Sequence, residues 1–263
     1  MDCSGKIVWI TGASSGIGEA LAYEFSRKGG QLVLSARNVS RLAEVRNACV
    51  NPGAHMVMGL DLNQPDSFGN ACREVLKHFG KVDILINNSG VSQRSLAAQT
   101  GMDVDRAIME TNYFGTIGLT KALLPSMLER GSGHIVVITS VAGKLGTPLR
   151  SSYSASKHAL HGFFDSLRAE TWRQGIRITM VCPGFIRTNI SINALTGNGT
   201  PQGTMDNAQA CGMPAHVCAE KIVKAVEKNK AEVNIGGKEV IGIYLKRFVP
   251  GIFNMIIKRA RVT

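Results

Sequence analysis

Two side chains that could exchange protons with a substrate lie four residues apart in the stretch YSASKHAL, which begins at Tyr153. Residues at positions i and i+4 of a helix are neighbours on its surface, so a helix here would bring the Lys157 ammonium beside the Tyr153 phenol. A nearby cation favours the phenolate and lowers the pKa of a tyrosine from its ordinary value of about 10. A tyrosine tuned in this way could protonate a carbonyl oxygen or deprotonate an alcohol.

A glycine-rich turn near the start of the chain could bind phosphate groups. The stretch TGASSGIG joins a β-branched run to an amphipathic segment and places Gly12, Gly16 and Gly18 in the turn. Glycines let the backbone approach a phosphate closely, and the free amide groups that open a helix carry partial positive charge. A tight turn without a ligand is the alternative, but a strand before it and a helix after it favour nucleotide binding.

The end of the second β-branched run bears on which nucleotide binds. Proteins that bind NAD usually carry an acidic residue there for a ribose hydroxyl. This chain has SARN instead, with Arg37 and no carboxylate. A guanidinium group can pair with the 2′-phosphate of NADP, whereas the alternative is a solvated surface arginine, which is ordinary in a loop. We expect the cofactor to be NADP(H).

These residues need a scaffold that holds them together. Amphipathic stretches separate recurring β-branched runs, which read KIVWIT, QLVLSA, HMVMGL, VDILIN, HIVVIT, IRITMV and EVNIG. Such alternation indicates a parallel sheet covered on both faces. The sequence therefore predicts α/β architecture: a single Rossmann-type, doubly wound domain over residues 1–263, with about seven strands and helices on both faces. The segment 189–213, rich in Gly, Asn, Thr and Ser, is expected to form a mobile lid over a pocket.

Composition narrows the classes of function. The chain has 263 residues, 44% of them hydrophobic, and no apolar run of the length that a membrane-spanning helix needs. Six cysteines without CxxC or metal-ligand spacing suggest reduced thiols and a cytoplasmic protein, and the six histidines show no metal-site spacing. The net charge of +11 favours anionic partners. No sequence motif supports nucleic-acid binding, and we expect neither a nucleic-acid partner nor a metal.

Taken together, the motifs give the chain a family resemblance. From about residue 5 to about residue 236 it resembles the short-chain dehydrogenases/reductases, whose motifs occur here in the family's order. The matching stretches are TGASSGIG (11–18), NNSG (87–90), Asn112 in ETNYFG, Ser140 in VVITSVAG, YSASK (153–157) and PGFIRT (183–188). Around VSQRSL and SKHALHGFFDSLRAE the chain looks most like the dehydrogenase/reductase SDR family member 7 group.

The resemblance implies a role for each matching residue. Tyr153 would be the general acid in reduction, and Ser140 would polarise and hold the same substrate oxygen. Lys157 would bind the nicotinamide ribose and lower the pKa of Tyr153. Asn112 would hold a water that links Lys157 to solvent; the alternative is a helix-interior amide bonded to backbone.

By the same resemblance, Asp61 would contact the adenine of the cofactor and Asn88 the adenosine ribose. Ile186 and Thr188 would contact the carboxamide. The expected cofactor-binding set is Gly12, Ser14, Ser15, Gly16, Ile17, Gly18, Arg37, Asp61, Leu62, Asn88, Gly90, Tyr153, Lys157, Pro183, Gly184, Ile186 and Thr188.

The expected activity is an NADP(H)-dependent interconversion of a ketone and a secondary alcohol. The alternative is a non-catalytic NADP-binding regulatory protein. Residues that follow strand ends should line the substrate site beside Ser140, and they are mostly apolar, with few fixed charges: Ser92, Gln93, Val141, Ala142, Leu145, Phe185 and Ile186. They predict a hydrophobic small-molecule carbonyl or alcohol substrate, such as a lipid-like, steroid-like or long-chain ketone. By resemblance we also expect a homodimer or homotetramer.

The C-terminal segment 238–263 combines basic and apolar residues. It contains one acidic residue, Glu239, and six basic residues: Lys238, Lys246, Arg247, Lys258, Arg259 and Arg261. Pro250 could open a short helix with Ile252, Phe253, Ile256 and Ile257 on one face. This face could touch an anionic membrane surface as a peripheral contact. Alternatively, it packs over the substrate pocket or against a neighbouring subunit.

Overall fold

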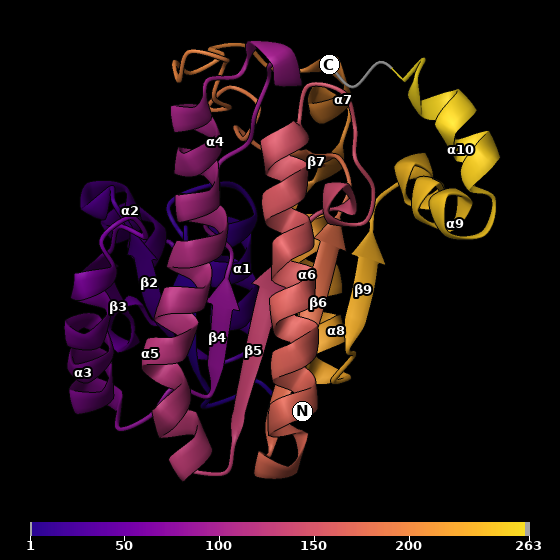
Figure 1. Cartoon of the computed structure of the whole chain (residues 1–263). Helices are drawn as coiled ribbons and strands as arrows, with labels where there is room; N and C mark the ends of the chain where they lie inside the picture. Colours follow the sequence, from indigo (N-terminus) through magenta and orange to yellow (C-terminus); the bar gives the residue numbers. More distant parts are fainter. Residues whose placement is uncertain (1, 261–263) are drawn as a thin grey trace.

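A parallel sheet of seven strands forms the centre of the computed structural model, which describes residues 2–260 (Figure 1). Its strands lie in the order β3-β2-β1-β4-β5-β6-β9, and every pairing is parallel. The bounds are β1 Ile7–Thr11, β2 Gln31–Ala36, β3 Met56–Gly59, β4 Ile84–Asn87, β5 Gly133–Ile138, β6 Ile176–Pro183 and β9 Glu232–Ile235. All five residues of β1 are buried, as expected for a central strand covered on both faces. The predicted fold class is confirmed.

Helices cover both faces of this sheet and enclose two apolar cores. One core lies between the sheet and α1, α2 and α8; the other lies between the sheet and α3, α5 and α6. The bounds are α1 Gly16–Arg27, α2 Val39–Asn47, α3 Phe68–Phe79, α4 Met102–Met109, α5 Gly115–Glu129, α6 Ser151–Thr171, α7 Asn207–Ala210, α8 Ala215–Glu227, α9 Ile241–Phe248 and α10 Pro250–Ile257. Trp9 and Phe164 are fully buried and belong to the second core.

The strand order changes direction between β1 and β4. The chain proceeds from β1 outward to β2 and β3, then returns to pair β4 with β1 through Ile10 and Ile86. The loops that leave the carboxyl ends of these two strands separate there and leave a crevice, which is where open α/β sheets bind ligands. The turn after β1 and the turn after β4 therefore border the same site.

The long helical segment expected from about residue 104 is interrupted. A π-helical turn, Glu110–Phe114, joins α4 to α5 and places Asn112 on its inner side, fully buried. Single π turns inside α-helices often mark functional sites, because the extra residue redirects one side chain. The segment remains one rod in outline (Figure 1).

The chain after β6 builds the walls above the sheet. Strands β7 (Ile186–Arg187) and β8 (Met213–Pro214) pair, and between them run the predicted lid residues, including α7. Ser191, Ala194 and Asp206 of this segment are buried, so it is anchored to the body of the protein. Helices α9 and α10 form a hairpin beyond β9 (Figure 1). The expected helix at Pro250 is present, but α9 was not predicted, and Arg261 lies outside the described residues.

Candidate active site

A cavity of about 1170 Å³ lies at the carboxyl ends of the strands. Its walls come from the glycine-rich turn, the ends of β2, β4, β5 and β6, the lid segment and the α9–α10 hairpin. Ligand pockets usually span about 300–1,000 Å³, so this cavity has room for a dinucleotide together with a substrate.

The glycine-rich turn forms one end of the cavity. Gly12 and Gly16 have φ of +64° and +60°, a backbone conformation that side chains other than glycine rarely adopt. A Cβ at Gly16 would stand 3.1 Å from the Thr188 methyl, which would narrow the space between the turn and the loop after β6. Ser14, Ser15 and Ile17 also line the cavity. Gly18 does not line it, because it packs directly against the Gly12 carbonyl.

The residues that follow β2, β3 and β4 border the neighbouring part. Arg37 is exposed and lines the cavity, as do Asp61 and Leu62 after β3. Asn88 lines it too, but its side-chain amide already donates to the carbonyl oxygens of Thr11 (2.9 Å) and Gly12 (3.2 Å). Asn88 therefore holds the glycine turn in place.

Tyr153 and Ser140 meet in the middle of the cavity. Helix α6 supplies Tyr153, whose side chain is 8% exposed, and the loop after β5 supplies Ser140. Burial raises the pKa of Tyr153, against the opposing effects of the Ser140 hydrogen bond and the charges of Arg150 and Arg94. Lys157, which was expected to lower this pKa, is not among the groups that shift it, and burial has the largest effect. A phenol held neutral in this way is a proton donor at neutral pH.

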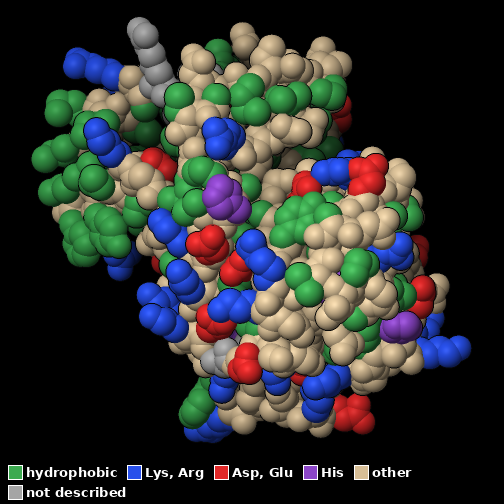
Figure 2. All heavy atoms as spheres, turned by 180° about the vertical axis from the view of Figure 1, so that it is seen from behind, with side chains coloured by type: hydrophobic (Ala, Val, Ile, Leu, Met, Phe, Trp, Pro, Cys, Tyr) green, Lys and Arg blue, Asp and Glu red, His purple; other side chains and the backbone are tan. Residues whose placement is uncertain are grey.

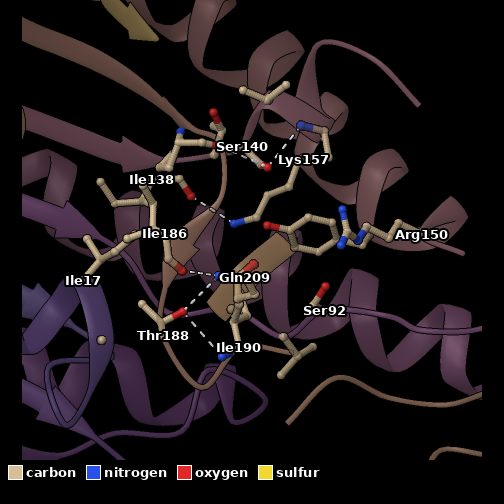
Figure 3. Close-up of a pocket in the computed structure, with 18 of the residues that line it drawn as sticks. Ile17, Ser92, Ile138, Ser140, Arg150, Lys157, Ile186, Thr188, Ile190 and Gln209 are labelled. Atoms are coloured by element: carbon tan, nitrogen blue, oxygen red, sulfur yellow. Dashed lines mark hydrogen bonds between the residues drawn. The ribbon is translucent and has the colours of Figure 1, made fainter. Parts of the chain in front are cut away.

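Lys157 lies one helical turn beyond Tyr153 and points into the same part of the cavity. Its Nζ donates to the Ile138 carbonyl at 2.9 Å and lies 5.8 Å from the centre of the Tyr153 ring (Figure 3). Burial lowers the pKa of Lys157 to about 8, because a charged ammonium is poorly solvated there. The i, i+4 neighbourhood predicted from the sequence is present.

Asn112 supports this group from behind the cavity wall. Its side chain donates to the Val91 carbonyl (2.9 Å) and to Ser156 Oγ (3.0 Å), and accepts from the Val91 amide (2.8 Å). A Cβ at Gly90 would stand 3.1 Å from Asn112 Oδ1 and 3.4 Å from Lys157 Nζ. Only glycine therefore lets the backbone at position 90 lie this close to both side chains. Asn112 does not line the cavity itself.

The loop after β6 closes the opposite side. Pro183, Gly184, Ile186 and Thr188 all line the cavity. The Gln209 side chain donates to the Ile186 carbonyl and lies 3.4 Å from Thr188 Oγ1 (Figure 3). This fixes the β7 loop to the lid segment.

Glu239 holds the other end of that loop. Its Oε1 accepts from the amides of Phe185 and Gly237, both at 3.0 Å. A side chain at position 184 would clash sterically with this carboxylate, so glycine is needed there. Glu239 also lines the cavity, which the sequence did not indicate.

Most residues expected at the substrate end do line the cavity. They are Ser92, Val141, Ala142, Leu145, Phe185 and Ile186. Gln93 does not: it is fully buried, and its Oε1 accepts from the Ser152 amide at 2.8 Å. The physical reason is that successive side chains of this loop point to opposite sides, as in a strand. Ser92 and Arg94 therefore face the cavity, and Gln93 faces the start of α6.

Two arginines at the substrate end were not predicted. Arg94 Nε donates to Asp206 Oδ2 at 2.7 Å, and Arg150 lies 3.5 Å from the same oxygen, with its guanidinium over the Phe185 ring. Both arginines line the cavity and both are buried, so the expectation of few fixed charges there is wrong. Arg150 is the N-cap residue of α6 and lies three residues before Tyr153. This short distance along the sequence could have indicated that Arg150 lies near the site.

The residues present fit a nicotinamide dinucleotide. Two left-handed glycines and two serines in the turn that leads into α1 offer backbone amides to a phosphate, and Lys157 with Ser140 and Tyr153 forms a polar centre at the other end. Within residues 2–260, no group of three His, Cys, Asp or Glu side chains could hold a metal ion. Over the same range, no helix has the length and apolarity to cross a membrane.

Comparison with known proteins decides the family. The family model described as short chain dehydrogenase matches residues 6–198. The chain belongs to the short-chain dehydrogenase/reductase family. A dehydrogenase/reductase SDR family protein 7-like of Drosophila melanogaster is 44% identical over 98% of this chain and 81% of its own length. Dehydrogenase/reductase SDR family member 7B of Mus musculus is also 44% identical, over 97% of this chain and 81% of its own.

Solved short-chain dehydrogenases share the fold. One from Streptomyces avermitilis is 30% identical, with a TM-score of 0.80 over 97% of this chain and 95% of its own. One from Burkholderia cenocepacia, solved with NADP, has a TM-score of 0.82 at 22% identity over 98% of this chain and 99% of its own. One from Burkholderia phymatum, solved with NAD, has a TM-score of 0.84 at 24% identity, covering 96% of both chains.

Proposed function

We propose that this short-chain dehydrogenase/reductase is an NADP(H)-dependent oxidoreductase that interconverts a hydrophobic ketone and the corresponding secondary alcohol. The observation that carries the proposal is the meeting of Tyr153, Ser140 and Lys157 in one cavity that also contains the glycine-rich turn. The same convergence argues against a purely regulatory nucleotide-binding protein, which would have no use for a buried proton donor beside the cofactor site.

In the direction of reduction, the Tyr153 hydroxyl donates its proton to the substrate oxygen. Ser140 donates a hydrogen bond to the same oxygen and stabilises the negative charge that develops on it. A nicotinamide cofactor, when bound, would supply the hydride for the carbonyl carbon. Lys157 binds the ribose hydroxyls next to the nicotinamide, and Asn112 fixes the backbone of Val91 and, through Ser156, the helix that carries Tyr153.

Preference for NADP(H) is supported by charge at the end of β2. Arg37 lines the cavity there, and its neighbours Ala36 and Asn38 carry no negative charge. A 2′-phosphate would meet a cation at this point, and no carboxylate there would compete for it.

A substrate with an apolar body and a polar end suits the rest of the cavity. Val141, Leu145 and Phe185 line the apolar wall near Tyr153, and α9 and α10 extend it with Leu245, Phe253 and Ile257. The guanidinium groups of Arg94 and Arg150 make the polar end. The free thiols of all six cysteines suit a reducing compartment, so we also propose a cytoplasmic location for this domain.

The test is NADPH oxidation with a panel of apolar ketones, comparing the wild type with Tyr153→Phe. Loss of general acid catalysis should lower the rate by about 10²- to 10⁴-fold, while NADPH affinity stays within about twofold. Tyr113→Phe is the matched control, because it removes the same hydroxyl outside the cavity and should keep wild-type rates. Near-normal turnover in Tyr153→Phe would refute the mechanism. Tight NADPH binding without oxidation by any ketone would favour the regulatory protein.

A further inference from the structure

The α9–α10 hairpin has an inner apolar face that forms part of the cavity. Leu245 of α9 and Phe253 and Ile257 of α10 pack with Val141 and Leu145, which lie next to the catalytic Ser140. These contacts are made by the inward-facing residues of both helices. In α10 these residues, Phe253 and Ile257, are four positions apart and therefore lie on one side of the helix. Of the expected common face of Ile252, Phe253, Ile256 and Ile257, the last three residues line the cavity and Ile252 does not.

A second apolar face of the same hairpin is exposed. Phe248 is 75% exposed and Met255 is 60% exposed, and three other large apolar side chains of the hairpin are exposed without lining the cavity: Tyr244, Val249 and Ile252. Isolated exposed apolar residues are ordinary, but a contiguous patch on a protruding element marks an interaction surface. Figure 2 shows the patch as a lobe of hydrophobic side chains set apart from the mixed surface of the main body.

The margins of this outer face are positively charged. Arg247, Lys258 and Arg259 are exposed and do not line the cavity, whereas Lys238 lines it and Lys246 Nζ donates to the Lys144 carbonyl at 3.0 Å. The segment 238–260 has one acidic residue, Glu239, and its carboxylate accepts from the Phe185 and Gly237 amides toward the cavity. The surface thus offers apolar and basic groups with no exposed acid, which complements an anionic lipid bilayer. The cores of protein interfaces, by contrast, are depleted of lysine.

We propose that the outer face of the α9–α10 hairpin docks on an anionic lipid bilayer and that a lipid-like substrate passes from the bilayer along the hairpin into the cavity. The inner and outer faces belong to the same two short helices, so docking places the apolar wall of the cavity next to the acyl chains. The second half of the proposal rests on the proposed reductase function, whereas the docking half does not.

Docking is tested with the full chain, without cofactor or substrate. Sedimentation with phosphatidylcholine vesicles is compared with sedimentation with vesicles that also contain phosphatidylserine, at low and high salt. We expect binding to the anionic vesicles that high salt weakens. Replacing Arg247 and Lys258 by glutamine should weaken it by up to about 30-fold, from about 1 kcal/mol per basic residue.

The apolar contribution is tested with the triple variant Phe248→Ser, Ile252→Ser, Met255→Ser. None of the three side chains lines the cavity, so the variant should fold, bind NADPH and reduce a water-soluble ketone like the wild type. It should lose vesicle binding and the reduction of a ketone embedded in vesicles. Trp172→Ser removes another exposed apolar side chain, 63% exposed and far along the sequence, and should keep both.

Three results would overturn the docking proposal. One is no binding to anionic vesicles at low salt. Another is equal binding of the triple variant and the wild type. The third is a wild-type dimer that the triple variant converts to monomer without any vesicle binding, which would make a second copy the occupant. Vesicle binding by a protein without reductase activity would instead contradict the proposed function and leave docking in place.

Discussion

The proposed preference for NADP(H) over NAD(H) depends on the side chain of Arg37. Arg37→Ala should weaken NADPH binding by about 10- to 150-fold, the range of a charge-assisted hydrogen bond, and leave NADH binding nearly unchanged. Fluorescence titration of both cofactors measures the two dissociation constants. Arg41→Ala is the matched control, because Arg41 pairs with Glu19 and Glu44 and does not line the cavity. Equal losses for both cofactors in Arg37→Ala would contradict its role.

The buried ammonium of Lys157 should make stability depend on pH. Its folded-state pKa of about 8 lies below the ordinary value of 10.5, so between these values the unfolded chain binds more protons and stability rises with pH. Lys157→Met lacks this titration. The difference in unfolding free energy, wild type minus variant, should therefore grow by about 3 kcal/mol from about pH 7 to about pH 10. Urea unfolding across that range measures it; a flat difference would show that Lys157 is not buried as a charge.

Individual site residues differ in how far the sequence could reveal them. Tyr153 and Lys157 were predictable because they lie one helical turn apart, whereas Ser140 was identified through the family resemblance of its motif. Gln93 was misplaced, because a side chain in an irregular loop can turn to either side. Arg94 and Arg150 were missed, since their common partner Asp206 is more than fifty residues from either and only the fold brings the three together.

At the scale of elements, the lid segment is held by one buried carboxylate. Burial alone would raise the pKa of Asp206, but hydrogen bonds from Arg94 and Gln202 outweigh burial and hold this pKa below its usual value. Asp206→Asn keeps the shape and removes the charge, which leaves buried guanidinium groups without their carboxylate.

This variant should lose about 3–5 kcal/mol of stability, the usual cost of breaking a buried ion pair. Hydrogen exchange should increase in residues 189–213 and remain unchanged in α3. Asp165→Asn is the control: it breaks the surface pair with Arg168, with the Asp165 side chain 55% exposed, and should cost at most about 1 kcal/mol. Equal protection of the lid in Asp206→Asn and the wild type would show that the ion pair does not anchor it.

The elements themselves were largely predictable. All seven β-branched runs are the seven strands, because a strand buried on both faces has to be apolar throughout. The π turn in the long helix could not be foreseen, since it depends on contacts of Asn112 with Val91 and Ser156. Helix α9 was missed because its eight residues are fewer than the window over which helical periodicity of apolar residues can be recognised.

For the whole molecule, a buried histidine limits stability in acid. His134 on β5 is 2% exposed; its Nε2 lies 2.8 Å from Thr179 Oγ1, and its Nδ1 has no hydrogen-bond partner among the described residues. Burial, aided by Arg177, lowers the pKa of His134 to about 4. Between about pH 6.5 and pH 4 the unfolded chain therefore binds more protons, and stability falls as the pH falls.

His134→Gln should remove up to about 3 kcal/mol of this acid-dependent loss. Urea unfolding at several pH values in this window measures the slope for the wild type and the variant. His78→Gln, at an exposed histidine, is the control and should keep the wild-type slope. Identical slopes for the wild type and His134→Gln would show that the histidine does not titrate on unfolding.

In the proposed reaction, a nicotinamide cofactor would deliver hydride to a ketone in the cavity while Tyr153 supplies the proton. The most direct test uses NADPH carrying deuterium at C4 of the nicotinamide, in each of its two configurations, with mass spectrometry of the alcohol product. We expect the wild type to place one deuterium on the former carbonyl carbon from one of the two configurations, and Tyr153→Phe to form at least about 100-fold less labelled product. Alcohol formed without deuterium from either configuration, or equal labelling by Tyr153→Phe, would contradict it.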